Sequence, residues 1–194
     1  VFVIFIFLNV SPVFGASPDK NSKEIIANSE NFFEGKFRNI KTTYTNLRTL
    51  ERKSTLKEWF FPPEDKNPLG PLPTIKFKGQ DLTEGKFVWF GHSTLLMKTE
   101  GLVVMTDPVF NRASPLPSFS SKSKSSFFNG KPFVFENPIL IEDLPKVDVV
   151  IISHDHYDHL DSKAIKDLSN LVDHFIVPLG VGAHLERWGV DKNK

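Results

Sequence analysis

The residue types best suited to chemistry are concentrated in residues 154–159, which read His-Asp-His-Tyr-Asp-His. Alternate side chains of extended backbone point the same way, so His154 and His156 can converge on one metal ion. Asp158 and His159 follow as the backbone turns, and they can present a carboxylate oxygen and an imidazole nitrogen to a second ion. The alternative is a polar surface turn, but three histidines and two aspartates in six residues favour a two-metal cluster.

The ligand types narrow the choice of metal and of reaction. The chain has no cysteine, which excludes disulfides and thiolate sites, and imidazole with carboxylate suits two zinc ions, or iron or manganese. Zinc lowers the pKa of bound water from about 16 to about 7, and two ions also stabilise a developing oxyanion. The cluster therefore predicts hydrolysis by metal-bound hydroxide, with Asp158 as the catalytic residue that orients or deprotonates the water.

Regular elements must position this cluster. Residues 147–152 form a nearly continuous apolar run, which predicts a strand covered on both faces. Asp161 is a helix N-cap, and residues 175–177 predict a second buried strand. Apolar residues then recur at helical spacing over residues 181–188, and Gly189 ends that helix. Alternating strands and helices indicate an α/β fold.

Upstream of the cluster, three short runs rich in Val, Leu, Phe and Trp predict an antiparallel meander over residues 86–90, 94–98 and 102–106. His92 and Asp107 each stand at the end of one of these strands. Either side chain could support the metal ligands through a hydrogen bond, so both are secondary candidates rather than ligands.

The two remaining histidines are weaker candidates. His184 shares an apolar helix face with Val181 and Leu185, where a packed histidine is the better interpretation. His174 comes just before a predicted strand and is interpreted as a surface residue. We expect neither to bind metal.

The spacing His154-x-His156-x-Asp158-His159 resembles the signature of the metallo-β-lactamase superfamily, whose fold is a four-layer αββα sandwich. Other segments follow the order seen in the branch that contains N-acyl-phosphatidylethanolamine-hydrolysing phospholipase D and its bacterial relatives. These segments are residues 37–39, 88–94, 106–110, 113–115, 143–145, 151–153 and 177–180. The resemblance implies an α/β (α+β) sandwich, of which this chain holds mainly the first half.

By this resemblance, His154 and His156 would bind the first ion, and Asp158 and His159 the second. The branch completes its site with a histidine, a bridging aspartate and a final histidine that lie beyond the matched segment. We therefore expect an N-terminal fragment that is inactive alone. Residues 17–80 would be an N-terminal extension that packs on the domain, and residues 81–194 the first half of the domain.

The N-terminal residues 1–16 combine an apolar run, too short to span a bilayer comfortably, with Ser, Pro, Gly and Ala. They predict a signal peptide, with a membrane anchor or a buried strand as alternatives, and hence an exported protein in the periplasm or at a membrane. The polar residues 17–23 are expected to be a linker, and residues 24–56 to form one or two short helices.

The charge balance restricts the partners. Lys plus Arg is 24 against 23 for Asp plus Glu, a net charge of +1 that offers no field to attract nucleic acid. The leading hypothesis is a di-zinc phosphodiesterase of phospholipase D type, acting on a small-molecule or lipid-like phosphodiester at a membrane surface. The alternatives are a lactonase or nuclease of the same fold, and a non-catalytic truncated remnant with an incomplete site.

Overall fold

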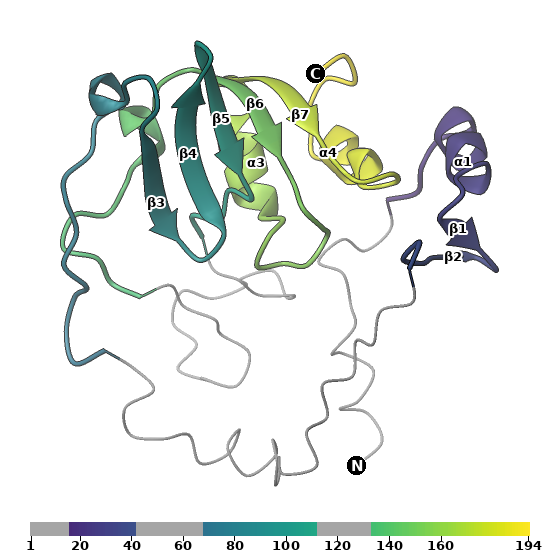
Figure 1. Cartoon of the computed structure of the whole chain (residues 1–194), viewed down its shortest axis with the longest axis horizontal. Coiled ribbons are helices and arrows are strands. Elements are labelled where there is room, and N and C mark those ends of the chain that lie inside the picture. The colour runs from purple at the N-terminus through teal and green to yellow at the C-terminus, as the bar shows by residue number, and fades with distance from the viewer. Residues whose placement is uncertain (1–15, 42–67, 112–132) are drawn as a thin grey trace, which may run out of the picture.

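A five-stranded sheet forms the centre of the protein, in the order β3-β4-β5-β6-β7 (Figure 1). The computed structural model describes residues 16–41, 68–111 and 133–194, so residues 1–15 of the predicted signal peptide lie outside the described residues. The strands are β3 (Phe87–Gly91), β4 (Thr94–Thr99), β5 (Leu102–Thr106), β6 (Val147–Ile151) and β7 (Val172–Ile176).

The strand directions bring several strand ends to one edge of the sheet. β3, β4 and β5 are antiparallel neighbours, which confirms the predicted meander. β5 pairs with β6 in parallel, and β6 pairs with β7 in parallel. Consequently β3, β5, β6 and β7 all run the same way, and their carboxyl ends meet at the same edge (Figure 1).

Two helices follow the parallel strands, as an α/β fold requires. Asp161 caps α3 (Ser162–Leu168) by accepting hydrogen bonds from the backbone N–H groups of Lys163 and Ala164. α4 (Gly182–Arg187) ends just before Gly189, whose φ of +99° lies in the left-handed region that glycine adopts without strain. The mixed α/β class is confirmed.

The strand β7 begins three residues earlier than predicted. Its first residue, Val172, is fully buried, but Asp173 and the exposed His174 follow it. β7 is the last strand in the sheet order, so polar side chains are tolerated at its outward positions and interrupt the apolar run.

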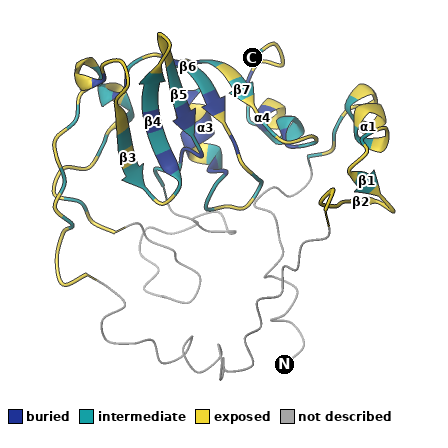
Figure 2. Ribbon diagram, viewed as in Figure 1, coloured by how far each residue is buried: buried dark blue, intermediate teal, exposed yellow. Residues whose placement is uncertain are grey.

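Both helices contribute to one core on one face of the sheet. Leu96, Met105 and Val150 of the sheet are fully buried and belong to the same apolar cluster as Ile165 of α3 and Leu185 of α4. That face therefore holds the core, which is the dark blue region of Figure 2.

The opposite face of the sheet is much less covered by the described residues. Phe87, Trp89, Ile151 and Ile176, which occupy alternate strand positions, are 70%, 65%, 38% and 57% exposed. The prediction that residues 147–152 are covered on both faces is thus wrong at Ile151, whereas Val147, at an alternate position on the same face, is fully buried. The reason is that α3 and α4 pack on the same side.

The N-terminal extension differs from its prediction in two places. Residues 17–23 do not form a linker only, because Asp19 accepts a hydrogen bond from the backbone N–H of Ser22 and caps α1 (Lys20–Ala27). Residues 32–37 form a hairpin rather than a helix, with strands β1 (Phe32–Phe33) and β2 (Lys36–Phe37). The predicted helix positions beyond residue 41 lie outside the described residues.

The hairpin has a local cause. Glu34 and Gly35 both have positive φ angles, 50° and 75°, and such a pair favours a tight turn over a helix. The carboxylate of Asp19 also forms an ion pair with Lys192, which joins the extension to the end of the chain. The domain boundaries at residues 16 and 80 stay predictions.

Short 3-10 helices precede two of the strands, η3 (Gly79–Asp81) before β3 and η5 (Ile141–Asp143) before β6. Within the described residues, no helix is long and apolar enough to cross a membrane.

Replacement of Asp161 tests how the helix after the metal cluster is anchored. Besides capping α3, Asp161 accepts hydrogen bonds from the backbone and side-chain amides of Asn111 at 2.9 and 3.0 Å. Asp161→Ala loses both the capping hydrogen bonds and those from Asn111. We therefore expect the free energy of unfolding, measured in urea, to fall by about 2 kcal/mol or more. Asp161→Asn keeps a capping oxygen and should lose less. An unchanged free energy of unfolding in Asp161→Ala would contradict this anchoring role.

Candidate metal centre

Three segments that are distant in the sequence meet at the carboxyl edge of the sheet. His92 lies in the turn between β3 and β4, Asp107 directly follows β5, and residues 154–159 follow β6. The parallel pairing of β5 with β6 places the second and third segments side by side. The sheet topology therefore gathers every residue predicted for the site.

Asp107 is the most buried of these residues, at 5% exposed. Its Oδ1 accepts a hydrogen bond from the backbone N–H of Ser153 at 2.7 Å, and its Oδ2 accepts one from the Ser153 hydroxyl at 2.7 Å. The Nδ1 atom of His159 lies 2.8 Å from the same Oδ2. One carboxylate thus connects the end of β5 to both ends of the segment 153–159.

The backbone around Asp107 is fixed as well. Its N–H donates to the carbonyl of Ile151 at 2.9 Å, and its carbonyl accepts a hydrogen bond of 2.7 Å from the buried hydroxyl of Thr94. The same hydroxyl accepts a hydrogen bond from the backbone N–H of Val109 at 3.1 Å. These contacts hold Asp107 at a φ of +36°, a conformation that non-glycine residues seldom adopt.

Asp107 also determines which nitrogens the histidines expose. An ionised carboxylate only accepts hydrogen bonds, so His159 must donate from Nδ1, and its Nε2 keeps a lone pair. The Ser153 hydroxyl gives its single proton to Asp107, so at 2.9 Å it accepts from Nδ1 of His154. Both histidines are thereby left with Nε2 as the free atom, available to a metal ion.

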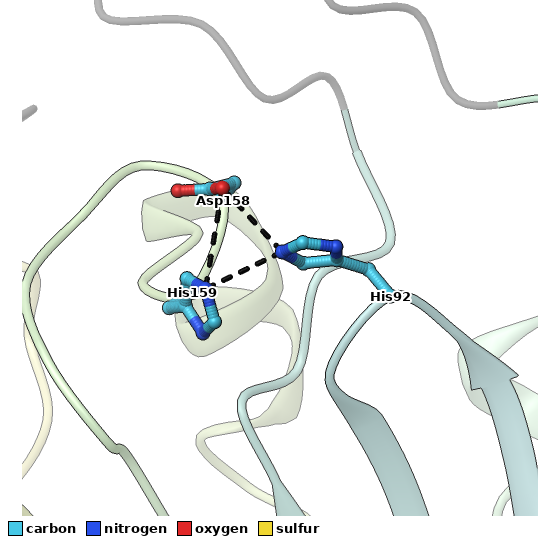
Figure 3. A group of neighbouring side chains, drawn as sticks. All are labelled: His92, Asp158 and His159. Atoms are coloured by element: carbon cyan, nitrogen blue, oxygen red, sulfur yellow. Dashed lines mark hydrogen bonds and ion pairs between the residues drawn. The ribbon is translucent and has the colours of Figure 1, made fainter. Parts of the chain in front are cut away.

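The free nitrogen of His159 faces two further ligand-type atoms. Nε2 of His92 lies 3.3 Å from Nε2 of His159 and 3.4 Å from Oδ2 of Asp158 (Figure 3). The Asp158 oxygen is 4.0 Å from Nε2 of His159. These three residues form a group whose ligand atoms lie within 4.8 Å of one another, close enough to hold one ion.

The other predicted ligand pair lies beside this group. The ring centroids of His154 and His156 are 4.5 Å apart, and those of His154 and His159 are 4.0 Å apart. Burial lowers the pKa of His154, and the neighbouring His159 and His156 lower that pKa further. A neutral imidazole is the form that binds metal, so these residues fit a divalent ion.

The structure therefore brings all four predicted ligands and both secondary candidates together. His92 lies nearer to the predicted ligand atoms than the sequence indicated, because the turn after β3 points its ring toward Asp158 and His159 (Figure 3). The sequence contains one signal for this proximity, the position of His92 at the end of a predicted strand. The metal-binding roles of these residues stay predictions.

The two histidines that were set aside lie elsewhere. His174 is exposed on β7. His184 stacks on Trp188 with a centroid distance of 6.2 Å, and its Nδ1 is buried with no hydrogen-bond partner among the described residues. Burial lowers the pKa of His184, partly offset by the negative charge of Asp155.

This pKa shift gives a pH dependence of stability with a definite sign. The unfolded state takes up a proton at His184 near pH 6.5, whereas the folded state resists it. The contribution of His184 is present above that pH and is lost as the pH falls toward the folded pKa. We expect the metal-free His184→Gln protein to lose less stability than the wild type between pH 7.5 and 5, measured by urea unfolding. The exposed His174→Gln serves as the control, and parallel pH profiles of wild type and His184→Gln would contradict the expectation.

The fold and the arrangement of the site agree with the family comparison. The model of the Beta-lactamase superfamily domain matches residues 103–194, from β5 to the end of the chain. These residues are thus similar to a beta-lactamase superfamily domain, and the mixed five-stranded sheet is consistent with that fold. The residue cluster after β6 lies within the matched segment.

Similar proteins come from bacteria and animals. An uncharacterized protein of Mycobacterium tuberculosis is 36% identical over 86% of this chain and 43% of its own length. The N-acyl-phosphatidylethanolamine-hydrolyzing phospholipase D 1 of Caenorhabditis elegans is 34% identical over 75% of this chain and 40% of its own length. The chain thus spans about two fifths of these relatives. Among solved structures it is similar to CmlA, a diiron beta-hydroxylase from Streptomyces venezuelae, with 24% identity, TM-score 0.39, and coverage of 53% of this chain and 19% of that one.

The central role of Asp107 can be tested by metal affinity. Asp107→Asn has only one acceptor oxygen, so it cannot accept both from the backbone N–H of Ser153 at one position and from the His159 ring at the other, and the fixed tautomer of His159 is no longer enforced. We expect zinc affinity, measured by competition with a chelator, to fall about 10- to 100-fold. Ser153→Ala removes only the hydroxyl next to His154 and should cause a smaller loss. Unchanged zinc affinity in Asp107→Asn would show that the carboxylate does not orient a ligand.

Proposed function

We propose that this chain carries half of a di-metal centre, most simply di-zinc, in a phosphodiesterase of phospholipase D type. The observation that carries the proposal is the hydrogen bond from His159 to the buried Asp107, which leaves Nε2 of His159 facing Asp158. Histidines that bind metal usually donate their other ring N–H to a carboxylate or carbonyl, so this hydrogen bond supports a metal site. The named phospholipase D relative supports the phosphodiester substrate.

Each side chain of the cluster has a proposed part. His154 and His156 would hold the first ion, and Asp158 and His159 the second. Divalent ions, when bound, supply hydroxide from water near neutral pH and neutralise charge on a phosphoryl oxygen. Asp107 and Ser153 keep the imidazole nitrogens oriented, so that these ligands need no reorganisation during the reaction.

Asp158 is the proposed catalytic residue of this chain. Its Oδ2 faces the imidazoles of His92 and His159, which leaves Oδ1 to accept a hydrogen bond from the attacking water. The side chain is 39% exposed, so water reaches it directly. In this position Asp158 can orient the water and accept its proton.

The substrate class follows from charge and similarity. The net charge of +1 gives no general attraction for nucleic acid, which argues against a nuclease. The relative from Caenorhabditis elegans is named for a phospholipid substrate, so we propose a lipid-like phosphodiester, met at a membrane surface by an exported protein. A lactonase or other hydrolase of the same fold is the alternative.

Further residues are needed to complete such a site and the fold around it. The first ion has only His154 and His156, whereas catalytic zinc generally has three protein ligands. The sheet face of Trp89, Ile151 and Ile176 is also open. We propose that the remainder of the sandwich covers this face and supplies ligands, as the 40% coverage of the named relative supports. If no such residues exist, the chain is a non-catalytic remnant.

The proposal is tested by assaying the protein at its full natural length, loaded with zinc, against N-acyl-phosphatidylethanolamine, a lactone and DNA. We expect cleavage of the phospholipid only, abolished by a chelator and restored by zinc. Asp158→Asn should lower kcat about 10²- to 10⁴-fold, because the proton acceptor is lost.

His174→Gln, on the exposed edge strand, is the matched control and should retain full activity. Cleavage of the lactone alone would replace the phosphodiesterase proposal with the alternative hydrolase. Failure to hydrolyse any of the three substrates would support the remnant.

A further inference from the structure

We propose that His92, from the turn between β3 and β4, is itself a metal ligand and binds the same ion as Asp158 and His159. This inference rests on the proposed metal centre. It adds to the cluster after β6 a ligand from a separate part of the sheet, about sixty residues earlier in the chain (Figure 3).

The first argument is the spacing of the three ligand atoms. Zinc binds nitrogen and oxygen at about 2.0–2.2 Å, so tetrahedral ligand atoms lie roughly 3.3–3.5 Å apart. Nε2 of His92 is 3.3 Å from Nε2 of His159 and 3.4 Å from Oδ2 of Asp158. The remaining separation, between Oδ2 of Asp158 and Nε2 of His159, is 4.0 Å, somewhat longer than this spacing.

The second argument is the chemical character of these atoms. Asp107 holds the proton of His159 on Nδ1, so Nε2 of His159 and the Asp158 carboxylate both present lone pairs to the same point. His92 directs its own Nε2 to that point, within reach of both. A cation bound between these three atoms accepts a lone pair from each of them. A single proton on Nε2 of His92, by contrast, cannot be donated equally to His159 and Asp158.

The third argument is that the backbone of His92 is held in an unfavourable conformation. Its φ is +45°, in the left-handed region, and it follows Gly91 with a φ of +106°. The indole N–H of Trp89 donates a hydrogen bond of 2.9 Å to the carbonyl of His92 and stabilises this turn. Glycine would adopt the same backbone without strain and histidine adopts it less readily, so the turn by itself does not favour a histidine at this position.

The decisive variant is His92→Gly, because we expect it to weaken metal binding without destabilising the metal-free protein. Removing the side chain relieves the strained φ, so the metal-free protein should be no less stable than wild type. If His92 is a ligand, zinc affinity at one of two sites should fall more than about 100-fold, beyond the loss for a residue that only supports a ligand.

Glu100→Gly is the matched control. Glu100 has a φ of +50° in the turn between β4 and β5, and its hydrogen bond to Glu84 uses the backbone N–H, which glycine retains. This variant relieves the same kind of strain far from the metal centre, so metal binding should be unchanged. His92→Asn is a second variant that tolerates positive φ and provides a polar side chain too short to replace the imidazole.

The measurements use the protein at its full natural length. Metal content after dialysis and zinc competition give stoichiometry and affinity, and the visible spectrum of the cobalt-substituted protein reports the loss of an imidazole ligand. In both His92 variants we expect one of the two ions to bind more weakly and the cobalt spectrum to change. If both variants retain two ions and the wild-type spectrum, His92 is not a ligand, even if KM changes. If the wild type binds no metal, the proposed function fails before the question of His92 arises.

Discussion

The organisation of the site depends on the buried carboxylate of Asp107. Charged groups are seldom buried unless their hydrogen-bonding capacity is satisfied, and here Ser153 and His159 satisfy both oxygens. The carboxylate reaches them only because β5 and β6 are parallel neighbours that end at one edge. The antiparallel pair β3 and β4 then adds the turn that carries His92. The strand order therefore brings all three segments of the candidate site to one edge of the sheet.

Much of this organisation was predictable from local patterns. The strands of the meander, the cap at Asp161 and the stop at Gly189 each follow from residue types whose effect is local. The spacing of residues 154–159 likewise predicts ligands because alternation along extended backbone needs no tertiary information. The early hairpin of the extension was missed, because its cause is the positive φ of Glu34 and Gly35 rather than an apolar period.

Other features could not be read from the sequence because they depend on contacts between distant segments. The proximity of His92 to Asp158 requires the order of the strands and the geometry of one turn. The exposed face of the sheet was also missed. The apolar run of β6 is the same whether or not the described residues cover that face. Apolar pattern records which positions avoid water, but it does not say what covers them.

The distribution of backbone strain separates the site from the rest of the fold. In the described ranges, four non-glycine residues have positive φ. Glu34 and Glu100 each precede a glycine in a hairpin turn, where such angles are part of the turn geometry. His92 and Asp107 instead carry side chains that converge on residues 154–159, and their backbones are held by hydrogen bonds from Trp89 and Thr94, respectively. The strained backbones that side-chain hydrogen bonds hold beside residues 154–159 thus lie where the orientation of a side chain determines which atoms face the cluster.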